Sequence, residues 1–410
     1  MKKLFVLWSS QAASLFGSAV VQFALAWYLA RETGSATVLS TALIVGIIPY
    51  VVLGPFVGPL IDRLSRKHIM IYADLFTAAL TAVLVVLFYT GNIEVWHIYL
   101  IMAGRSIGDV FQNPALSAAI PLIVQEKDLV RANGLFQMLQ SAIKIVAPLA
   151  GAFCMETLDM QWVLSIDVFT AVIAVGCLLP LRIPQPPRTT LTEKPNYFAD
   201  LKQGFAYIWA RPGLAMLIGL VTLLVFFAVP ASALFPIMVQ THLEGNVIML
   251  GWVGTSMGIG GILGGLIMSS WGGFKKRIHT AVFGFAIMIP CSVGIGLTSV
   301  DIFYSTTVPA MIIMGIGNTF IAASLTAIMN SVVAKDIQGR VFAIHGSVVT
   351  LAMPIGLLIA GPLVDAYDIR WLYFIASAAW FVILLLALVA KPLMNVEKLK
   401  TEQPPAQDTA

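Results

Sequence analysis

Twelve apolar stretches, each about as long as a membrane-spanning helix, constrain the fold of this 410-residue chain more than any other feature. A helix that crosses the hydrocarbon core of a bilayer needs about 20 predominantly apolar residues. The stretches are long and lack the alternation typical of a half-buried strand, which favours helices. We therefore expect an all-α membrane protein with twelve transmembrane helices, near residues 4–30, 38–61, 69–90, 96–123, 133–156, 162–182, 213–241, 250–271, 278–299, 304–333, 342–365 and 370–391.

The composition supports this interpretation. Hydrophobic residues make up 59% of the chain and charged residues 11%, whereas a soluble domain has about 45–50% and about 25%. This chain cannot cover itself with a solvated surface, which excludes a soluble enzyme, a nucleic-acid binder, a secreted disulfide scaffold and a disordered chain. We expect a monomer whose surroundings are the lipid bilayer and which has no nucleic-acid partner.

The distribution of basic residues predicts the orientation in the membrane. All but four of the 24 Lys and Arg residues fall in loops or tails on the side of the amino terminus, if that terminus is counted with them. Arg31 and Arg370 lie on the opposite side, and Arg105 and Lys144 lie within spans. By the positive-inside rule, both termini are expected in the cytoplasm of a protein of the cell's inner (plasma) membrane.

One long polar break divides the spans into six plus six. The predicted parts are an amino-terminal six-helix bundle at 1–182, a cytoplasmic linker with an amphipathic helix at 183–212, a carboxyl-terminal six-helix bundle at 213–392 and a cytoplasmic tail at 393–410. The linker helix either lies along the membrane interface or packs as a plain connector. Basic clusters follow both the second and the eighth span, which indicates an internal duplication typical of secondary transporters.

The energy source for any transport has to be a gradient. ATP-driven transport needs a phosphate-binding loop that contains Gly-Lys, and that dipeptide is absent from the sequence. The five histidines lie near predicted helix ends without metal-ligand spacing. We therefore expect neither an enzyme nor catalytic residues, a metal or a cofactor.

Ionisable residues inside the spans are the candidates for function, because each is costly to insert into a bilayer. They are Asp74, Arg105, Asp109, Lys144 and Asp167. Arg105, Asp109 and Lys144 are expected near the midplane, whereas Asp74 and Asp167 are closer to span ends, where water can reach them. Arg105 and Asp109 are four residues apart, so they share a helix face and can pair.

This predicted pair suggests a mechanism of proton coupling. A carboxylate beside cations such as Arg105 and Lys144 stays ionised, and the same group in an apolar setting takes up a proton. A helix rearrangement that changes the partners of Asp109 would then load or release a proton. The alternative is a purely structural Arg105–Asp109 pair that holds two helices together.

A second motif lies in the loop after the second span. Gly58-x-x-x-Asp62-Arg63-x-x-Arg66-Lys67 places one acid and three bases at a cytoplasmic helix end, where they can form a gating network between helices. In the fifth span, Pro148 and Gly151 are expected to bend the helix.

The duplicated plan and the segment Gly58-Pro-Leu-Ile-Asp-Arg-Leu-Ser-Arg-Lys67 resemble the major facilitator superfamily and its loop 2–3 signature. Within this superfamily, nearly the whole chain resembles the macrolide efflux (Mef-type) drug:proton antiporters. The motifs that carry this resemblance are Thr33-Gly-Ser-Ala, Arg105-Ser-Ile-Gly, Phe111-x-x-Pro-Ala115, Leu139-Gln-Ser141, Ala233-Leu-Phe-Pro236, Gly339-Arg-Val-Phe342 and Leu351-Ala-Met-Pro-Ile-Gly356.

The resemblance implies two pseudo-symmetric bundles and assigns roles to several residues. Arg105 corresponds to the family's buried arginine of span four, which is associated with proton transfer. Pro148 and Gly151 match part of the antiporter motif of span five. The sequence departs from the family pattern at Ser65 and Ala147, where glycine is usual.

These observations predict proton-coupled efflux of amphiphilic drugs such as macrolides by alternating access. A pocket of aromatic residues with few amides suits bulky apolar ligands. The candidate cavity residues are Gln22, Phe111, Gln137, Gln140, Phe227 and Asn318. The alternatives are an exporter of an endogenous siderophore or lipid-like compound, and a non-transporting membrane sensor or scaffold.

Overall fold

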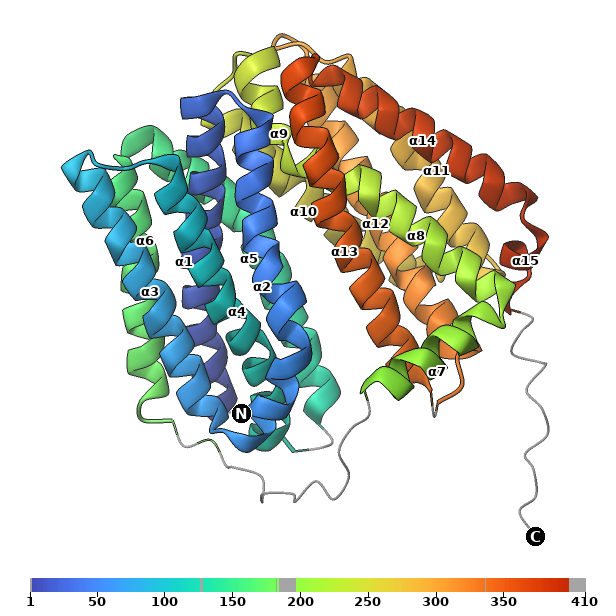
Figure 1. Ribbon diagram of the computed structural model, residues 1–410, viewed down its shortest axis with the longest axis horizontal. Coiled ribbons are helices and arrows are strands. Elements are labelled where there is room, and N and C mark those ends of the chain that lie inside the picture. Colours follow the sequence, from blue (N-terminus) through green and yellow to red (C-terminus); the bar gives the residue numbers. More distant parts are fainter. Residues whose placement is uncertain (1, 126–127, 182, 184–196, 336, 398–410) are drawn as a thin grey trace. The chain divides into compact units, whose positions relative to one another are not determined.

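A computed structural model describes residues 2–125, 128–181, 183, 197–335 and 337–397, and its long helices follow the predicted spans (Figure 1). The first half contains α1 (Lys2–Thr33), α2 (Ala36–Arg63), α3 (Arg66–Thr90), α4 (Val95–Ile123), α5 (Leu129–Thr157) and α6 (Met160–Leu178). The second half contains α7 (Tyr197–Trp209), α8 (Pro212–Ala233), α9 (Phe235–Ile237), the π-helical turn η2 (Met238–His242), α10 (Val247–Trp271), α11 (Arg277–Gly296), α12 (Phe303–Val332), α13 (Gln338–Ala366), α14 (Arg370–Val389) and α15 (Lys391–Met394).

Eleven candidate spans in the described residues are long and apolar enough to cross a membrane. The long helix α4 is not among them, although it has 29 residues. Its middle carries Arg105, Asp109, Gln112 and Asn113, which lower its hydropathy. The helix that carries two of the three predicted coupling residues, Arg105 and Asp109, is therefore the long helix of the first half that falls outside the candidate spans.

The seventh predicted span, near 213–241, differs from a single α-helix. It runs as α8, α9 and η2, with a change in helical geometry at Leu234. Pro236 follows directly and has no N–H to donate to the carbonyl four residues earlier, so the α-helical bonding cannot continue unchanged.

Local sequence explains several of the helix ends. The side chain of Ser35 accepts a hydrogen bond from the N–H of Val38 and caps α2, and Ser65 caps α3 in the same way. Gly91 ends α3 with a φ of 71°, a left-handed conformation that glycine adopts without strain. Ser65, which stands where the family pattern has glycine, therefore has a local structural role.

The described chain divides into two compact units. Unit 1 consists of Met1–Leu191, Ala233–Gly258 and Leu357–Ile369, and unit 2 of Thr192–Ser232, Ile259–Gly356 and Arg370–Ala410. Neither the predicted domain boundaries nor the predicted cytoplasmic position of the termini is tested by this division, and both stay predictions.

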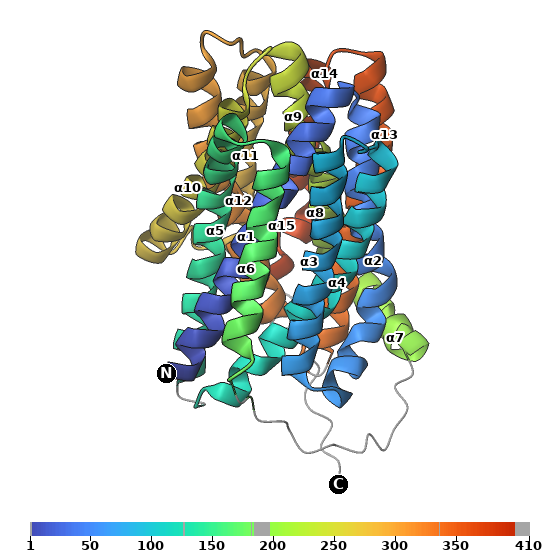
Figure 2. The same ribbon diagram turned by 90° about the vertical axis from the view of Figure 1, so that its left-hand side faces the viewer.

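In unit 1, α1 packs against α5 and α6, α3 against α4 and α6, and α2 against α4 (Figure 2). The start of α10 lies so close to α5 that a Cβ added to Gly254 would be 2.8 Å from Cβ and Cγ of Pro148. Thr255 Oγ1 donates a hydrogen bond to the carbonyl of Ile145 at 2.7 Å. The end of α13 is held by Asp365, whose carboxylate accepts hydrogen bonds from the backbone at the start of α2.

In unit 2, α11 packs against α12 and α14 around the fully buried Trp380. The linker helix α7 is attached to this unit through Ile208, which is buried in a cluster with residues of α8, α12 and α13. Leu201, Phe205 and Trp209 on α7 are exposed. The helix predicted in the linker is thus present; of its predicted apolar face, the side chain of Phe198 lies outside the described residues.

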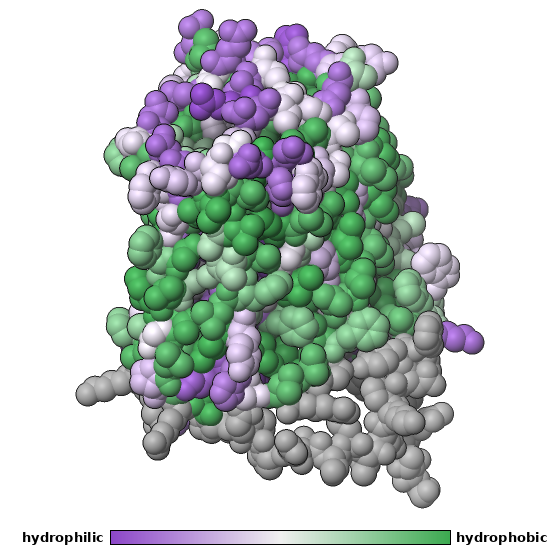
Figure 3. Space-filling view, turned by 60° about the vertical axis from the view of Figure 1, so that its left-hand side comes forward, coloured by the Kyte–Doolittle hydropathy of each residue, from purple (hydrophilic) through white to green (hydrophobic). Residues whose placement is uncertain are grey.

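The outer surface of the molecule is strongly apolar. Figure 3 shows a broad hydrophobic area on one face, with hydrophilic residues gathered at one end. Large hydrophobic side chains that are more than half exposed lie on α3 and α6, among them Tyr72, Val83, Val86, Phe169, Val172 and Ile173. Such a surface is stable in contact with lipid and unstable in water.

Candidate functional site

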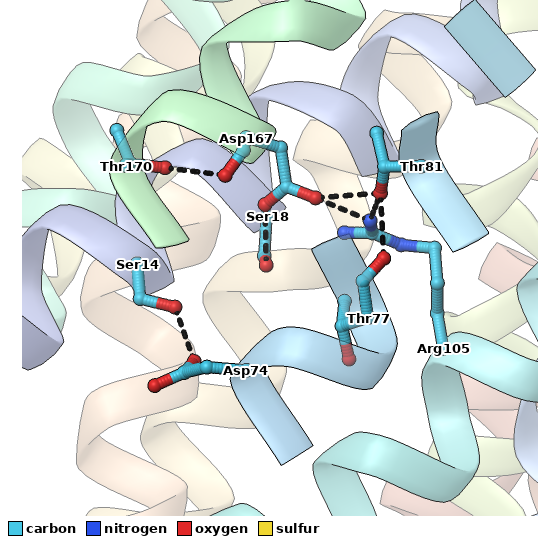
Figure 4. A network of polar contacts seen from close by, with 8 residues as sticks. All are labelled: Ser14, Ser18, Asp74, Thr77, Thr81, Arg105, Asp167 and Thr170. Atoms are coloured by element: carbon cyan, nitrogen blue, oxygen red, sulfur yellow. Dashed lines mark hydrogen bonds and ion pairs between the residues drawn. The ribbon is translucent and has the colours of Figure 1, made fainter. Parts of the chain in front are cut away.

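Two polar stripes face each other inside unit 1. Polar residues spaced by three or four positions lie on one face of a helix. The stripe on α1 is Gln11, Ser14 and Ser18, and the stripe on α3 is Asp74, Thr77 and Thr81. Both stripes lie on largely apolar helices, and α4 and α6 add further polar groups (Figure 4).

An ion pair between α4 and α6 is the centre of this network. Arg105 Nη1 lies 2.5 Å from Asp167 Oδ2, and the side chains are 10% and 2% exposed. Thr81 Oγ1 donates to the same carboxylate oxygen at 2.7 Å, and Ser18 Oγ donates to Oδ1 at 2.9 Å. Arg105 Nη1 also contacts Thr81 Oγ1. Asp167 is therefore held by one cation and two hydroxyls from three helices, and its contact with Arg105 is a charge-assisted hydrogen bond.

Asp74 occupies a different environment, because it contacts only neutral groups. Ser14 Oγ and Gln112 Nε2 each donate to Asp74 Oδ1 at 2.7 Å, and Gln11 Nε2 donates to Oδ2 at 3.3 Å. Gln112 Nε2 also donates to Gln11 Oε1 at 3.0 Å. Asp74 is 1% exposed, so protein covers it completely.

The predicted partner of Arg105 is wrong, because its ion pair is with Asp167 and not with Asp109. A residue four positions away can reach Arg105, but Asp167 offers a carboxylate already held in place by Ser18 and Thr81. The expectation that water reaches Asp74 and Asp167 is also wrong, since each is 1% exposed.

Asp109 remains within the electrostatic influence of Arg105, Asp167 and Asp74. It is half-buried on α4, and among the described residues it makes no ion pair or hydrogen bond. One turn further along α4, the amide of Asn113 donates to the hydroxyl of Tyr50 on α2 at 3.0 Å. Of the three carboxylates Asp74, Asp109 and Asp167, Asp109 thus has the fewest direct polar contacts.

Lys144 is exposed on α5, and no ion pair of this residue is seen among the described residues. The structure does not bring it into the network around Arg105. Its role in coupling stays a prediction.

The candidate cavity residues lie in both units. In unit 1, Gln22 and Gln137 are exposed, Gln140 is half-buried, and Phe111 packs against an apolar cluster to which α1–α6 all contribute. In unit 2, Asn318 is exposed. Phe227 packs beside Trp380 and Phe285 in the core of that unit, with its ring 5.0 Å from that of Phe226. The role of these six residues in substrate binding stays a prediction.

The gating motif is described only in part. The side chains of Asp62 and Arg63 and the surroundings of Gly58, at the end of α2, lie outside what the structure describes. Arg66 is buried, and Lys67 Nζ donates to the carbonyl of Leu179 after α6 at 2.6 Å. The basic part of the motif therefore connects α3 to the end of α6.

The two predicted bend positions lie within α5, which is helical from Leu129 to Thr157. A Cβ added to Gly151 would be 3.1 Å from Cδ1 of Phe23, which explains a small residue there by the close approach of α1. Pro148 contacts α10 as described above. Their effect on helix curvature stays a prediction.

Sequence reasoning identified Asp74 and Asp167 as ionisable but missed Gln11, Ser14 and Gln112 as partners. The signal that could have revealed them is the spacing of polar residues on α1 and α3. Each stripe follows an i, i+3, i+7 pattern, which is typical of one buried helix face. Two such stripes within one bundle favour a shared polar interior.

Comparisons with known proteins agree with this architecture. The chain matches the Major Facilitator Superfamily profile over residues 7–356 and 228–408. It is 34% identical to macrolide efflux protein A of Streptococcus pyogenes over 400 residues, which are 97% of either chain. It is 36% identical to macrolide efflux protein A of Enterococcus faecalis over 79% of this chain and 100% of that protein. Among solved structures, the D323A mutant of the nucleoside transporter NupG superimposes with a TM-score of 0.74 at 14% identity, covering 93% of this chain and 98% of that one.

Proposed function

This chain belongs to the major facilitator superfamily of membrane transporters, and we propose that it exports macrolide-like amphiphiles from the cell in exchange for protons. The observation that carries the substrate class is the likeness to macrolide efflux protein A, which extends over nearly the entire length of both chains. The plasma membrane is the expected location, with both termini in the cytoplasm by the positive-inside rule.

Asp109 is the proposed proton carrier. It lies near Arg105 but has no hydrogen-bond or ion-pair partner among the described residues, whereas Arg105 is already paired with Asp167. A carboxylate that leaves the influence of a cation for an apolar setting gains a proton from water, and it returns the proton to water when the cation is near again. Lys144 would act as a second cation for Asp109 in another arrangement of the helices.

Alternating access between the two six-helix halves would couple this proton step to export. The motif Gly58, Asp62, Arg63, Arg66 and Lys67 would form contacts on the cytoplasmic side in one state and break them in the other. The substrate would be bound by the cavity residues Gln22, Phe111, Gln137, Gln140, Phe227 and Asn318, with Pro148 and Gly151 shaping the path of α5.

The substrate class is tested by expression in a bacterial host that lacks its own macrolide exporters. We expect higher resistance to erythromycin than in cells with the empty vector, and lower accumulation of labelled erythromycin that rises when a protonophore collapses the proton gradient. Unchanged accumulation in cells that contain the protein in their membrane would contradict the proposal.

Asp109→Asn tests the coupling. In reconstituted vesicles we expect macrolide-driven proton movement to fall to the level of protein-free vesicles, because the amide cannot exchange a proton. Glu156→Gln removes the same charge from an exposed position of α5 and serves as the control. Undiminished proton movement in Asp109→Asn would end the role of Asp109.

A further inference from the structure

The group of ionisable side chains around Arg105 in unit 1 contains more acids than bases. Three carboxylates, Asp74, Asp109 and Asp167, are close enough to influence one another electrostatically. Arg105 is the one cation among the described residues that acts on this group. If all three acids were ionised, the site would carry an uncompensated charge in a medium of low dielectric constant, which is strongly unfavourable.

The contacts show which acid is compensated. Arg105 and two hydroxyls hold Asp167, so its negative charge is balanced directly. Asp109 is half-buried and feels the charge of Arg105. Asp74 is 1% exposed and accepts hydrogen bonds only from the neutral side chains of Gln11, Ser14 and Gln112. A negative charge is therefore least favourable on Asp74.

The same heavy-atom positions suit a protonated Asp74. A serine hydroxyl can rotate and either donate or accept, so the 2.7 Å contact with Ser14 Oγ remains when the acid donates its own proton. The groups that face Asp74 from α1 and α4 are Gln11, Ser14 and Gln112, and the charged groups nearby are Asp109, Asp167 and Arg105. The protonated carboxyl of Asp74 therefore keeps its hydrogen-bond partners without the movement of any cation.

Thr77 provides a second observation at this site. It lies one turn after Asp74 and one turn before Thr81 on the same face of α3 (Figure 4). Its hydroxyl is buried and has no hydrogen-bond partner among the described residues. The face of α3 that carries Asp74 and Thr81 thus also carries a buried hydroxyl that is free to donate or accept.

We propose that Asp74 is a second proton-binding residue of the transport cycle and is the neutral acid in the conformation that the structure describes. Its partners come from α1 and α4 while it lies on α3, so a movement of α3 against these helices removes the partners and admits water. The O–H bond of the carboxyl then breaks, its proton passes to a water molecule, and the carboxylate remains until a proton returns from the other side. This inference rests on the proposed exchange of substrate for protons.

Infrared difference spectroscopy on the full-length protein in lipid vesicles tests the protonation state without any substrate. We expect the carbonyl stretch of a protonated carboxylic acid at neutral pH, and its loss in Asp74→Asn. Asp365→Asn, which changes a carboxylate bonded to backbone N–H groups, should leave the band unchanged. A spectrum of Asp74→Asn identical to that of the wild type would overturn the proposal.

Transport assays test the role of that proton. We expect Asp74→Asn to lose macrolide efflux driven by a proton gradient and to keep downhill equilibration of the macrolide, with partial recovery in Asp74→Glu. Full proton-driven efflux by Asp74→Asn would refute the role of Asp74 and leave the proposed function intact. If the wild type transports no macrolide, the proposed function fails, and the infrared band still decides whether Asp74 holds a proton.

Discussion

The interiors of the two units differ in the kind of polar group that they bury. All charged residues that are buried among the described residues belong to unit 1: Arg66, Asp74, Arg105 and Asp167. Among the described residues of unit 2, the buried polar residues carry hydroxyls, and the ring nitrogens His345 Nε2 and Trp380 Nε1 are buried as well. Ser292 and Ser377 each donate to the carbonyl of Tyr373, at 3.2 and 2.7 Å, and the hydroxyl of Tyr373 donates to the carbonyl of Ala231 at 2.9 Å.

This difference indicates how the two units can have different roles. A hydroxyl bonded to a backbone carbonyl adds stability but has no charge to exchange in the physiological pH range. A buried carboxylate changes its charge when its partners change. Under the proposed mechanism the interior of unit 1 responds to protons, whereas the aromatic core of unit 2 around Trp380 is expected to respond only to packing.

Arg105→Ala should lower stability and transport more than any other change proposed here, and it tests the difference between the buried charges of unit 1 and the uncharged groups of unit 2. It leaves Asp167 buried without its cation, and breaking a buried pair costs about 3–5 kcal/mol. We expect a lower thermal unfolding temperature in detergent and loss of transport. Arg277→Ala removes an exposed arginine of unit 2, which donates to the carbonyl of Ala327, and should change the unfolding temperature little.

Ser18→Ala and Ser292→Ala compare one hydroxyl from each unit. Ser18 donates to the ionised Asp167, and a hydrogen bond to a charged group contributes about 1.5–3 kcal/mol. Ser292 donates to a backbone carbonyl, so its loss should cost about 0.5–1.5 kcal/mol. Denaturant titrations measure the loss in the free energy of unfolding for each variant. Equal losses would contradict the expected difference between the two units.

Tyr373→Phe should have the smallest effect on transport. It removes the donor to Ala231 from the core of unit 2, at a cost of about 0.5–1.5 kcal/mol in stability. Because no charge changes, the pH dependence of macrolide efflux should match that of the wild type. A shifted pH profile would show that proton exchange extends into unit 2.

Most of the fold could be predicted from hydropathy, since each span must present about 20 apolar residues to lipid. The predicted helix at 304–333, for example, is observed as α12, Phe303–Val332. The change of helical geometry at Leu234 was not predicted, because hydropathy records the length of an apolar stretch and not its hydrogen bonding.

The sequence could predict which charged residues belong to the candidate site but not how they pair. Arg105, Asp74 and Asp167 are conspicuous because charge is costly within a span. Their pairing was not predictable, since sequence spacing reports neighbours on one helix and favoured Asp109 for Arg105. The actual partner, Asp167, lies on α6, 62 positions along the chain.

The sequence by itself determined the membrane environment, the spans and the identity of the costly charges, because each of these follows from the free energy of placing single residues in lipid. Only the tertiary structure decided that Arg105 neutralises Asp167 and that Asp74 is surrounded by neutral donors. The physical reason is that the energy of a buried charge depends on the groups within a few ångströms, and helix packing brings those groups from distant parts of the chain.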